Sequence, residues 1–430
     1  MIKMKNSGIE WIGEIPDDWN LIRFKDICVN HKEIVGTRSS NFDRLALTLN
    51  GVIRRDKDDS DGLQPKEFDG YQIIYENDFI FKMIDLQNIS TSRVGLSPYT
   101  GLVSPAYIRF SPRKKGQYNL FVYYFLMSLY YNCVYNNLGG NGVRSALNAT
   151  DMGQFLIPFP SLDTQIQIVS MIENRCAAVD RLIENQQAQI EKLKEYKQSV
   201  ITEAVTRGLA PSVPMKASGI EWVGNIPTGW EVKRTKYVAT SIFKGNGITK
   251  EDVVIDGDTP CVRYGEIYSK YNISFSQCKS RTNKSNVTVL QYFHYGDILF
   301  AGTGELVEEI GKNIVYLGKE RGLAGGDIVI LRHMQNPAFL NYALYATYSQ
   351  MQKSCGKAKL KVVHISATEI GNIFIVLPSI TEQQQIADYL DKKCAEIDKL
   401  IAIKQQKIET LTEYKKSLIY EYVTGKKQVG

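Results

Sequence analysis

Lysine, arginine, asparagine and serine gather in polar loops in two separate parts of the chain, and these residue types suit the binding of nucleic acid. Arginine and lysine hold phosphates, and these side chains also read the edges of bases. Any one such loop is more often simply a solvated turn, but the occurrence of similar loops in two divergent regions favours nucleic acid. The candidate DNA-binding residues are Arg54, Arg55, Ser92, Arg93, Asn141, Arg144, Lys244, Asn246, Lys279, Arg281, Lys284, Thr303, Lys357, Lys359 and Lys361.

Two short motifs could instead serve methyl transfer. FAGTG (300–304) resembles the FxGxG loop with which methyltransferases approach S-adenosylmethionine, and NPAF (336–339) resembles the NPPF tetrapeptide of adenine methyltransferases. NPAF lacks the second proline and follows FAGTG too closely for several alternating strands and helices. Asn336 is also suited to cap a helix and Pro337 to occupy its first turn. A self-contained adenine-N6 DNA methyltransferase is therefore the less favoured alternative.

No other catalytic pattern stands out. The four histidines show neither HExxH nor zinc spacing, and the motifs GxxxxGK[ST] and GxSxG are missing from the sequence. We therefore expect a non-catalytic chain that holds no metal and no cofactor of its own.

Composition indicates an ordinary soluble protein. Lysine and arginine total 52 against 46 acidic residues, a net charge of +6 that permits a polyanionic partner. Seven cysteines without CxxC pairs predict reduced thiols in the cytoplasm. The first residues lack the apolar region of a signal peptide, and the aromatic stretch 121–131 is too short to span a membrane, so we expect a buried helix there.

The elements that must position the candidate residues belong to an internal repeat. SGIEWIGEIPDDW (7–19) returns as SGIEWVGNIPTGW (218–230), and the segment that starts at Pro160 returns at Pro378. Weaker echoes link NDFIF to GDILF and ATDMG to ATEIG. The regions between the repeated segments share little else, mix short strand-like and aromatic helical runs, and predict small α/β domains.

The long repeated segment predicts a helix of about 43 residues, roughly 65 Å long. Its apolar residues alternate at spacings of four and three, interrupted at Gln186 and Lys197 in the first copy and at Lys404 and Lys415 in the second. The alternatives are two helices that each pack on their own globular half and two helices that pack on each other; the symmetry of the repeat favours an antiparallel coiled coil. The predicted coil core is Ile172, Cys176, Val179, Ile183, Ile190, Leu193, Leu390, Cys394, Ile397, Ile401, Ile408 and Leu411.

This organisation resembles, over nearly the whole chain, the specificity (S) subunit of type I restriction-modification systems. The resemblance rests on the twofold order of variable region and long helix, on the GxIPxxW motif that heads each half, and on the helix entries PSLDTQIQI and PSITEQQQI. It implies an α/β protein with two target-recognition domains in pseudo-twofold arrangement, separated by an antiparallel coiled coil. The expected segments are 1–27 (repeated motif), 28–155 (domain 1), 156–208 (helix 1), 209–238 (linker and second motif), 239–373 (domain 2) and 374–430 (helix 2 and tail).

The resemblance also implies partners. Double-stranded DNA with a bipartite site, two modification (methyltransferase) subunits and ATP-dependent restriction subunits are expected, with S-adenosylmethionine, ATP and Mg bound by those subunits. The chain itself is expected to direct adenine-N6 methylation and restriction without catalysing either. A coiled-coil adaptor that joins proteins without touching DNA remains a further alternative, although it leaves the basic loops unexplained.

Overall fold

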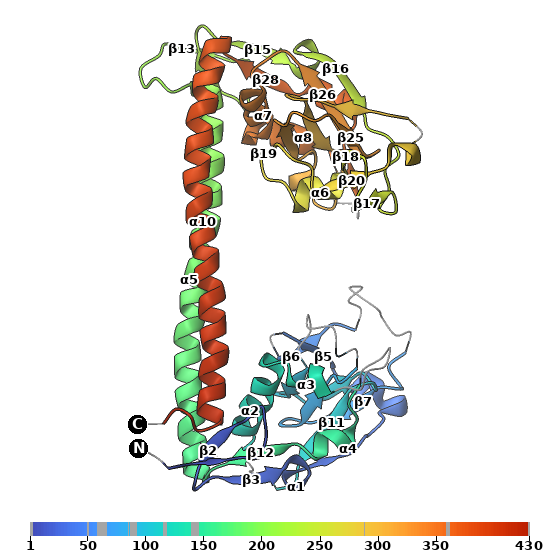
Figure 1. Cartoon of the computed structure of the whole chain (residues 1–430), viewed down its shortest axis with the longest axis vertical. Helices are drawn as coiled ribbons and strands as arrows, with labels where there is room; N and C mark the ends of the chain where they lie inside the picture. The colour runs from blue at the N-terminus through green and yellow to red at the C-terminus, as the bar shows by residue number, and fades with distance from the viewer. Residues whose placement is uncertain are drawn as a thin grey trace. The chain divides into compact units, whose positions relative to one another are not determined.

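The computed structural model describes residues 3–49, 51–57, 67–84, 86, 93–114, 118–138, 146–287, 289–357 and 362–428. The chain forms two compact units (Figure 1). The first comprises Met1–Gln187 and Gln406–Gly430, and the second Ala188–Gln405. Each unit is therefore built from both halves of the sequence.

The helices of the described residues range from single turns to two long rods. They are α1 (Phe24–Ile27), α2 (Leu120–Tyr131), α3 (Val134–Leu138), α4 (Ala149–Gly153), α5 (Leu162–Arg207), α6 (Tyr264–Ser269), α7 (Pro337–Tyr345), α8 (Thr347–Ser354), α9 (Ala367–Asn372) and α10 (Ile380–Val423). Short 3-10 turns are η1 (Gly36–Asn41), η2 (Thr235–Tyr237), η3 (Lys284–Asn286) and η4 (Val307–Glu309).

The strands of the first unit form two four-stranded sheets, in the orders β6-β5-β10-β7 and β4-β11-β8-β9, and two strand pairs, β1-β2 and β3-β12. Their bounds are β1 (Met4–Asn6), β2 (Glu14–Pro16), β3 (Asn20–Arg23), β4 (Cys28–Asn30), β5 (Arg44–Thr48), β6 (Gly51–Arg55), β7 (Gln72–Ile74), β8 (Phe79–Phe81), β9 (Val94–Leu96), β10 (Gly101–Val103), β11 (Ile108–Pro112) and β12 (Leu156–Phe159).

The second unit has two five-stranded sheets, in the orders β16-β26-β22-β24-β19 and β17-β20-β18-β25-β21, and the pairs β13-β14, β15-β28 and β23-β27. Their bounds are β13 (Met215–Ala217), β14 (Asn225–Pro227), β15 (Glu231–Arg234), β16 (Ala239–Lys244), β17 (Val253–Val254), β18 (Thr259–Val262), β19 (Ser274–Phe275), β20 (Ser280–Thr282), β21 (Tyr292–Phe293), β22 (Ile298–Ala301), β23 (Thr303–Gly304), β24 (Asn313–Tyr316), β25 (Gly322–Ala324), β26 (Ile328–His333), β27 (Val363–His364) and β28 (Phe374–Leu377).

The two variable regions share one topology despite their different sequences. In the first sheet of each, β4-β11-β8-β9 corresponds to β16-β26-β22-β24, and in the second, β6-β5-β10-β7 corresponds to β20-β18-β25-β21. One neighbouring pair is parallel in each second sheet: β5 with β10 and β18 with β25. The second unit adds an edge strand to each sheet, β19 and β17.

The faint sequence echo of NDFIF and GDILF marks a shared turn. Asn77 and Gly296, the first residues of the two segments, both have positive φ, at 67° and 88°. The aspartate that follows each accepts a backbone N–H three residues earlier and pairs with an arginine of the neighbouring strand. The two pairs are Asp78 with Arg109 at 2.6 Å and Asp297 with Arg332 at 2.8 Å.

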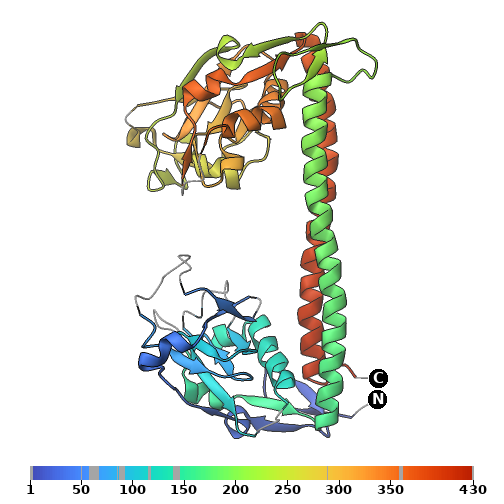
Figure 2. The same ribbon diagram turned by 180° about the vertical axis from the view of Figure 1, so that it is seen from behind.

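Helices α5 and α10 run side by side in each unit (Figures 1 and 2). Both begin at a serine whose hydroxyl accepts the N–H three residues on, Ser161 and Ser379. Each is followed by a glycine with positive φ, Gly208 or Gly425, a conformation that ends helices at little cost. The two rods therefore start and stop in the same way.

Burial along the two rods follows the alternating apolar residues. Ile172, Cys176, Val179, Ile190, Leu390, Cys394 and Ile397 are buried, and Ile183, Leu193, Ile401, Ile408 and Leu411 are half-buried. Ion pairs between the helices, discussed below, show that they run antiparallel. The mixed α/β fold class with two long helices is confirmed.

Each repeated short motif packs against the end of a long helix. In the second unit, the Trp230 indole donates to Glu382 at 3.0 Å and packs beside Gly208. In the first unit, Trp19 and Pro16 lie against Gly425, where no Cβ would fit. The motif therefore packs at a corner where a long helix ends.

The aromatic stretch 121–131 forms the buried helix expected from the sequence. It lies in α2, where Phe121, Phe125 and Leu126 have no exposed surface. Among the described residues, no helix combines the length and apolar character needed to cross a membrane.

A buried lysine lies in the second unit between β24, α7 and α8. The Lys353 ammonium donates to Asn313 Oδ1 and to the Leu344 carbonyl, both at 2.7 Å, and faces the Phe300 ring. Gly311 and Ile365 close the site, and within the described part of the chain no carboxylate forms an ion pair with it. Burial lowers the pKa of Lys353 to about 7.

We expect Lys353 to make stability rise with pH. Between about pH 7 and 10 the unfolded chain binds a proton at this lysine that the folded chain does not, so the free energy of unfolding rises by up to about 1.4 kcal/mol per pH unit. Denaturant unfolding of the wild type and of Lys353→Met at pH 7.5, 8.25 and 9 measures the difference. Equal slopes in the two proteins would contradict the prediction.

Candidate nucleic-acid interface

In the first unit, Arg54 and Arg55 lie on strand β6, at one edge of its sheet. Arg54 is exposed, stacks on the Tyr99 ring at 4.6 Å and pairs with Asp43 at 3.4 Å. Arg55, the next residue of the strand, is partly exposed. A guanidinium held over an aromatic ring keeps donors free for a ligand while its position is restrained.

In the second unit, the corresponding strand is β20, and it is flanked by the basic run that the sequence singled out. Arg281 lies on β20, Lys279 precedes it, and Lys284 follows in η3. Both lysines are exposed. Candidates chosen from sequence alone in two dissimilar regions therefore fall at equivalent places in one topology.

Arg281 also has a structural role. Its Nε donates to the Gly257 carbonyl at 2.6 Å and its Nη2 to the Asp258 carbonyl at 3.1 Å, while Glu320 lies 3.6 Å away. The guanidinium thus ties the β17–β18 turn to β20. With 39% of its side chain exposed, Arg281 also faces solvent.

Lys244 and Asn246 lie where β16 ends. Lys244 is exposed, whereas the Asn246 amide donates to the Val289 carbonyl at 3.3 Å. Lys244 is therefore the better placed of the two for a phosphate.

Thr303 and Lys357 are engaged within the protein. Thr303 is buried on β23, with its hydroxyl 3.1 Å from His364 Nδ1. The Lys357 ammonium, on a side chain only 13% exposed, donates to Glu369 and to the His364 carbonyl. Both residues contact His364 of β27, a role that their residue types did not reveal.

Arg93 requires a correction. Its side chain has no exposed surface, and Nη1 donates to the Ile84 carbonyl at 3.0 Å. A contact with DNA is therefore not expected of it. Five other candidates lie outside the described residues: Ser92, Asn141, Arg144, Lys359 and Lys361.

Sequence reasoning missed the turn between β24 and β25. Arg321 is exposed and stacks on the Tyr292 ring at 4.2 Å, and Lys319 lies beside it. Lys319 and Arg281 line a recess of about 540 Å³ together with Gln277 and Ser276. The basic residues of GKERG (318–322) were the sequence signal for this turn, but the glutamate between them is also typical of an ordinary charged turn.

The motifs that raised the question of methyl transfer have structural roles. FAGTG spans the end of β22 and β23, which pairs with β27 instead of leading into a helix. Asn336 caps α7 by accepting the Phe339 N–H at 2.9 Å, with Pro337 in the first turn, as the sequence predicted.

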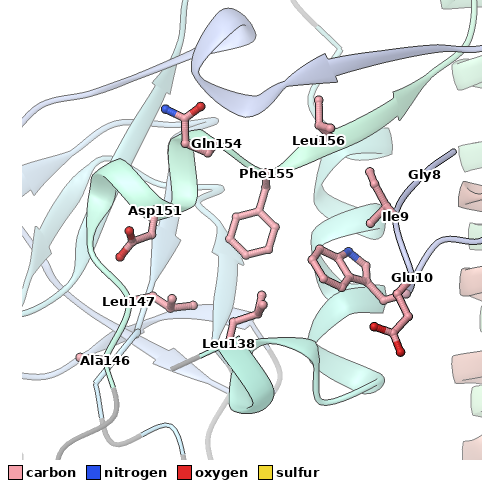
Figure 3. Close-up of a pocket in the computed structure, with 11 residues that line it drawn as sticks. Gly8, Ile9, Glu10, Leu138, Ala146, Leu147, Asp151, Gln154, Phe155 and Leu156 are labelled. Atoms are coloured by element: carbon pink, nitrogen blue, oxygen red, sulfur yellow. The ribbon is translucent and has the colours of Figure 1, made fainter. Parts of the chain in front are cut away.

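A recess of about 630 Å³ in the first unit separates the short motif from α3 and α4 (Figure 3). Phe155, Leu138 and Leu147 converge on it, and Asp151 and Gln154 lie at its rim. Its lining is largely apolar and pairs no nucleophile with a base. Among the described residues, no group of histidines, cysteines and carboxylates is arranged to hold a metal ion.

Comparison with known proteins decides the family. The model of the type I restriction modification DNA specificity domain matches residues 16–192 and again residues 227–413. The chain belongs to this family. The resemblance seen in the sequence is thereby confirmed, and the family is one of specificity subunits, which are non-catalytic components of type I systems.

Named relatives agree with this assignment. The type I restriction enzyme MjaVIII specificity subunit of Methanocaldococcus jannaschii is 25% identical, over 96% of this chain and 94% of that protein. A second relative from the same organism, named for the MjaX enzyme, is 24% identical over 97% and 96%. Both are named as specificity subunits and not as methyltransferases, which removes the support for the methyltransferase alternative.

A solved structure shows the same fold. It is described as the basis of complex assembly and conformational transition of the type I R-M system, and one of its chains matches with a TM-score of 0.66. The match covers 96% of this chain and 99% of that chain at 15% identity.

The two exposed lysines flanking β20 should contribute to the salt dependence of DNA binding. Each phosphate contact that is lost lowers the slope of log affinity against log salt by about 1. We expect Lys279→Ala/Lys284→Ala to lower it by about 2, measured by fluorescence anisotropy between 50 and 200 mM salt. Lys357→Ala is the matched control, because its ammonium is already paired with Glu369. A double variant with the wild-type slope would remove these lysines from the interface.

Proposed function

We propose that this chain recognises a bipartite DNA target, with one half-site read by each variable domain, and directs adenine-N6 methylation and restriction by partner subunits. Two modification subunits would supply S-adenosylmethionine, and restriction subunits would supply ATP and Mg. The site of action would be the cytoplasm, in keeping with seven cysteines that are all free. The domain limits expected from the sequence are part of this proposal.

The observation that carries the proposal is the repetition of one strand order with different side chains at equivalent places. Strand β6 presents Arg54 and Arg55, and the corresponding strand β20 presents Arg281 between Lys279 and the η3 turn. Two domains with the same strand order but different surface side chains are suited to reading two different DNA sequences.

Linkage then explains how modest contacts give a useful affinity. The first half-site contact makes the second intramolecular, so the two affinities compound provided that the linker holds a suitable separation. A continuous helix, such as α5, is a stiffer linker than an irregular segment of the same length.

Repeated exposed side chains on the rods support two copies of one partner. Tyr196 and Tyr414 occupy equivalent positions and are 50% and 45% exposed, and Leu182 and Leu400 are 46% and 48% exposed. Large apolar side chains that stay exposed at matching places in both rods are typical of a protein contact made twice.

The first experiment is to co-express the chain with its modification subunit and to map N6-methyladenine by single-molecule sequencing. We expect one bipartite motif with an unspecified spacer of fixed length. The variants Arg54→Ala/Arg55→Ala and Lys279→Ala/Lys284→Ala should each relax or weaken a different half of it. A short continuous motif methylated by this chain alone would restore the methyltransferase, and no methylation beside an active partner would favour the adaptor.

Partner docking can be tested by stoichiometry. Tyr196→Asp or Tyr414→Asp places a charge in one of the two proposed contacts, so each variant should bind one modification subunit instead of two, and the double variant none. Light scattering of purified complexes gives the masses. Tyr295→Asp is the control, because this tyrosine is 65% exposed and lies between β21 and β22 instead of on a long helix. Two subunits bound to the double variant would refute these contact sites.

A further inference from the structure

Each long helix carries one lysine that interrupts its apolar seam and meets an aspartate of the other helix. In the second unit, the Lys197 ammonium lies 2.7 Å from both carboxylate oxygens of Asp398. In the first unit, the Lys415 ammonium lies 2.7 Å from both oxygens of Asp180. The lysine side chains are 10% and 30% exposed and the aspartates 39% and 46%, so Lys197 is largely removed from water and the other three groups are half-buried or exposed.

The two pairs are reciprocal and belong to one register. Asp180 and Lys197 are 17 residues apart on α5, and Asp398 and Lys415 are 17 residues apart on α10. The lysine comes from α5 in one pair and from α10 in the other. Only an antiparallel alignment satisfies both pairs at once.

The apolar seam alone defines this alignment poorly. Isoleucine, leucine, valine and cysteine recur every three or four residues, so a shift by one heptad sets apolar residues opposite apolar residues again. A shift in one direction brings Lys197 level with Asp391 and Lys415 level with Glu173, whereas a shift in the other direction brings the two lysines level with Gln405 and Gln187. Asp180 would come level with Ile408 or with Tyr422, according to the direction of the shift, and Asp398 with Ile190 or with Ala204.

The energetic consequence concerns register more than stability. A partly buried ion pair contributes little net stability compared with apolar side chains of similar size, whereas a buried lysine left without an acid is unfavourable. Alignments that leave Lys197 without a carboxylate are therefore penalised, while the native one gains little. A single polar position is known to fix the register of coiled coils in this way.

The pair in the second unit is also tied to the variable domain. The Asn272 amide, just beyond α6, donates to Asp398 Oδ2 at 3.1 Å. Nearby, Gln198 of α5 donates to the Tyr345 carbonyl and Thr202 bonds Thr347. Asp398 therefore contacts both the other long helix and the variable domain.

We propose that the pairs Lys197–Asp398 and Lys415–Asp180 fix the register of the two helices and thereby the number of base pairs that the chain accepts between half-sites. The inference rests on the proposed bipartite recognition. A shift by one heptad moves a helix by about 10 Å, the length of roughly three base pairs. The four residues act as positioning residues that need not touch DNA.

The test uses the complex with modification subunits and duplexes that carry the mapped half-sites at the native spacing and at three base pairs more or less. We expect the wild type to prefer the native spacing by at least about tenfold in affinity. In Lys197→Met/Lys415→Met the seam remains apolar, but the preference should fall to about threefold or less. Reversing both pairs, with Lys197→Asp, Asp398→Lys, Lys415→Asp and Asp180→Lys together, should restore it.

Lys194→Met/Lys416→Met is the matched control, because these lysines pair with Glu191 and Glu413 of their own helices. It should keep the full preference. An unchanged preference in Lys197→Met/Lys415→Met, or an equal loss of affinity at every spacing that the fourfold reversal does not repair, would overturn the inference. A wild type that binds an isolated half-site as tightly as the bipartite duplex would instead overturn the proposed function, and the inference with it.

Discussion

Both units depend on the antiparallel packing of two long helices, which also contribute residues to the core of each unit. The core of the first unit combines Ile172 of α5 with Tyr422 of α10, and the core of the second combines Ile201 of α5 with Leu390 of α10. Neither half of the sequence completes its own core. This explains why the short motif occurs twice. In each unit, one copy packs against the end of the long helix that comes from the other half of the sequence.

A second consequence is a division of labour between frame and surface. The strand orders, the turns at Asn77 and Gly296 and the Asp–Arg pairs beside them are held in common, so they belong to the frame. The basic side chains differ in number and spacing on strands that correspond. Divergence confined to such positions can change the bases that are read without disturbing the cores on which the helix packing depends.

The sequence predicted the features that repeat, because repetition and periodicity are visible without coordinates. The two long helices belong to this group. The shared topology of the variable regions was not predictable, since only short echoes survive and strand order depends on long-range pairing. Individual site residues were the hardest, because the sequence does not show which protein groups a basic side chain will meet: Arg93 is buried and Lys357 is paired, whereas Lys279 remains exposed.

The contrast among these basic residues follows from one physical rule. A buried or half-buried cation must be paired with nearby oxygens, and once paired it has few donors left for a phosphate or a base. Backbone carbonyls and carboxylates accept hydrogen bonds from Arg93 and Lys357, and from part of the Arg281 guanidinium. These bonds fix the segments around the three residues. Exposed cations such as Lys284 are positioned by these fixed segments. A protein that reads DNA sequence thus needs both kinds of basic residue, one to hold the turn and one to face the DNA.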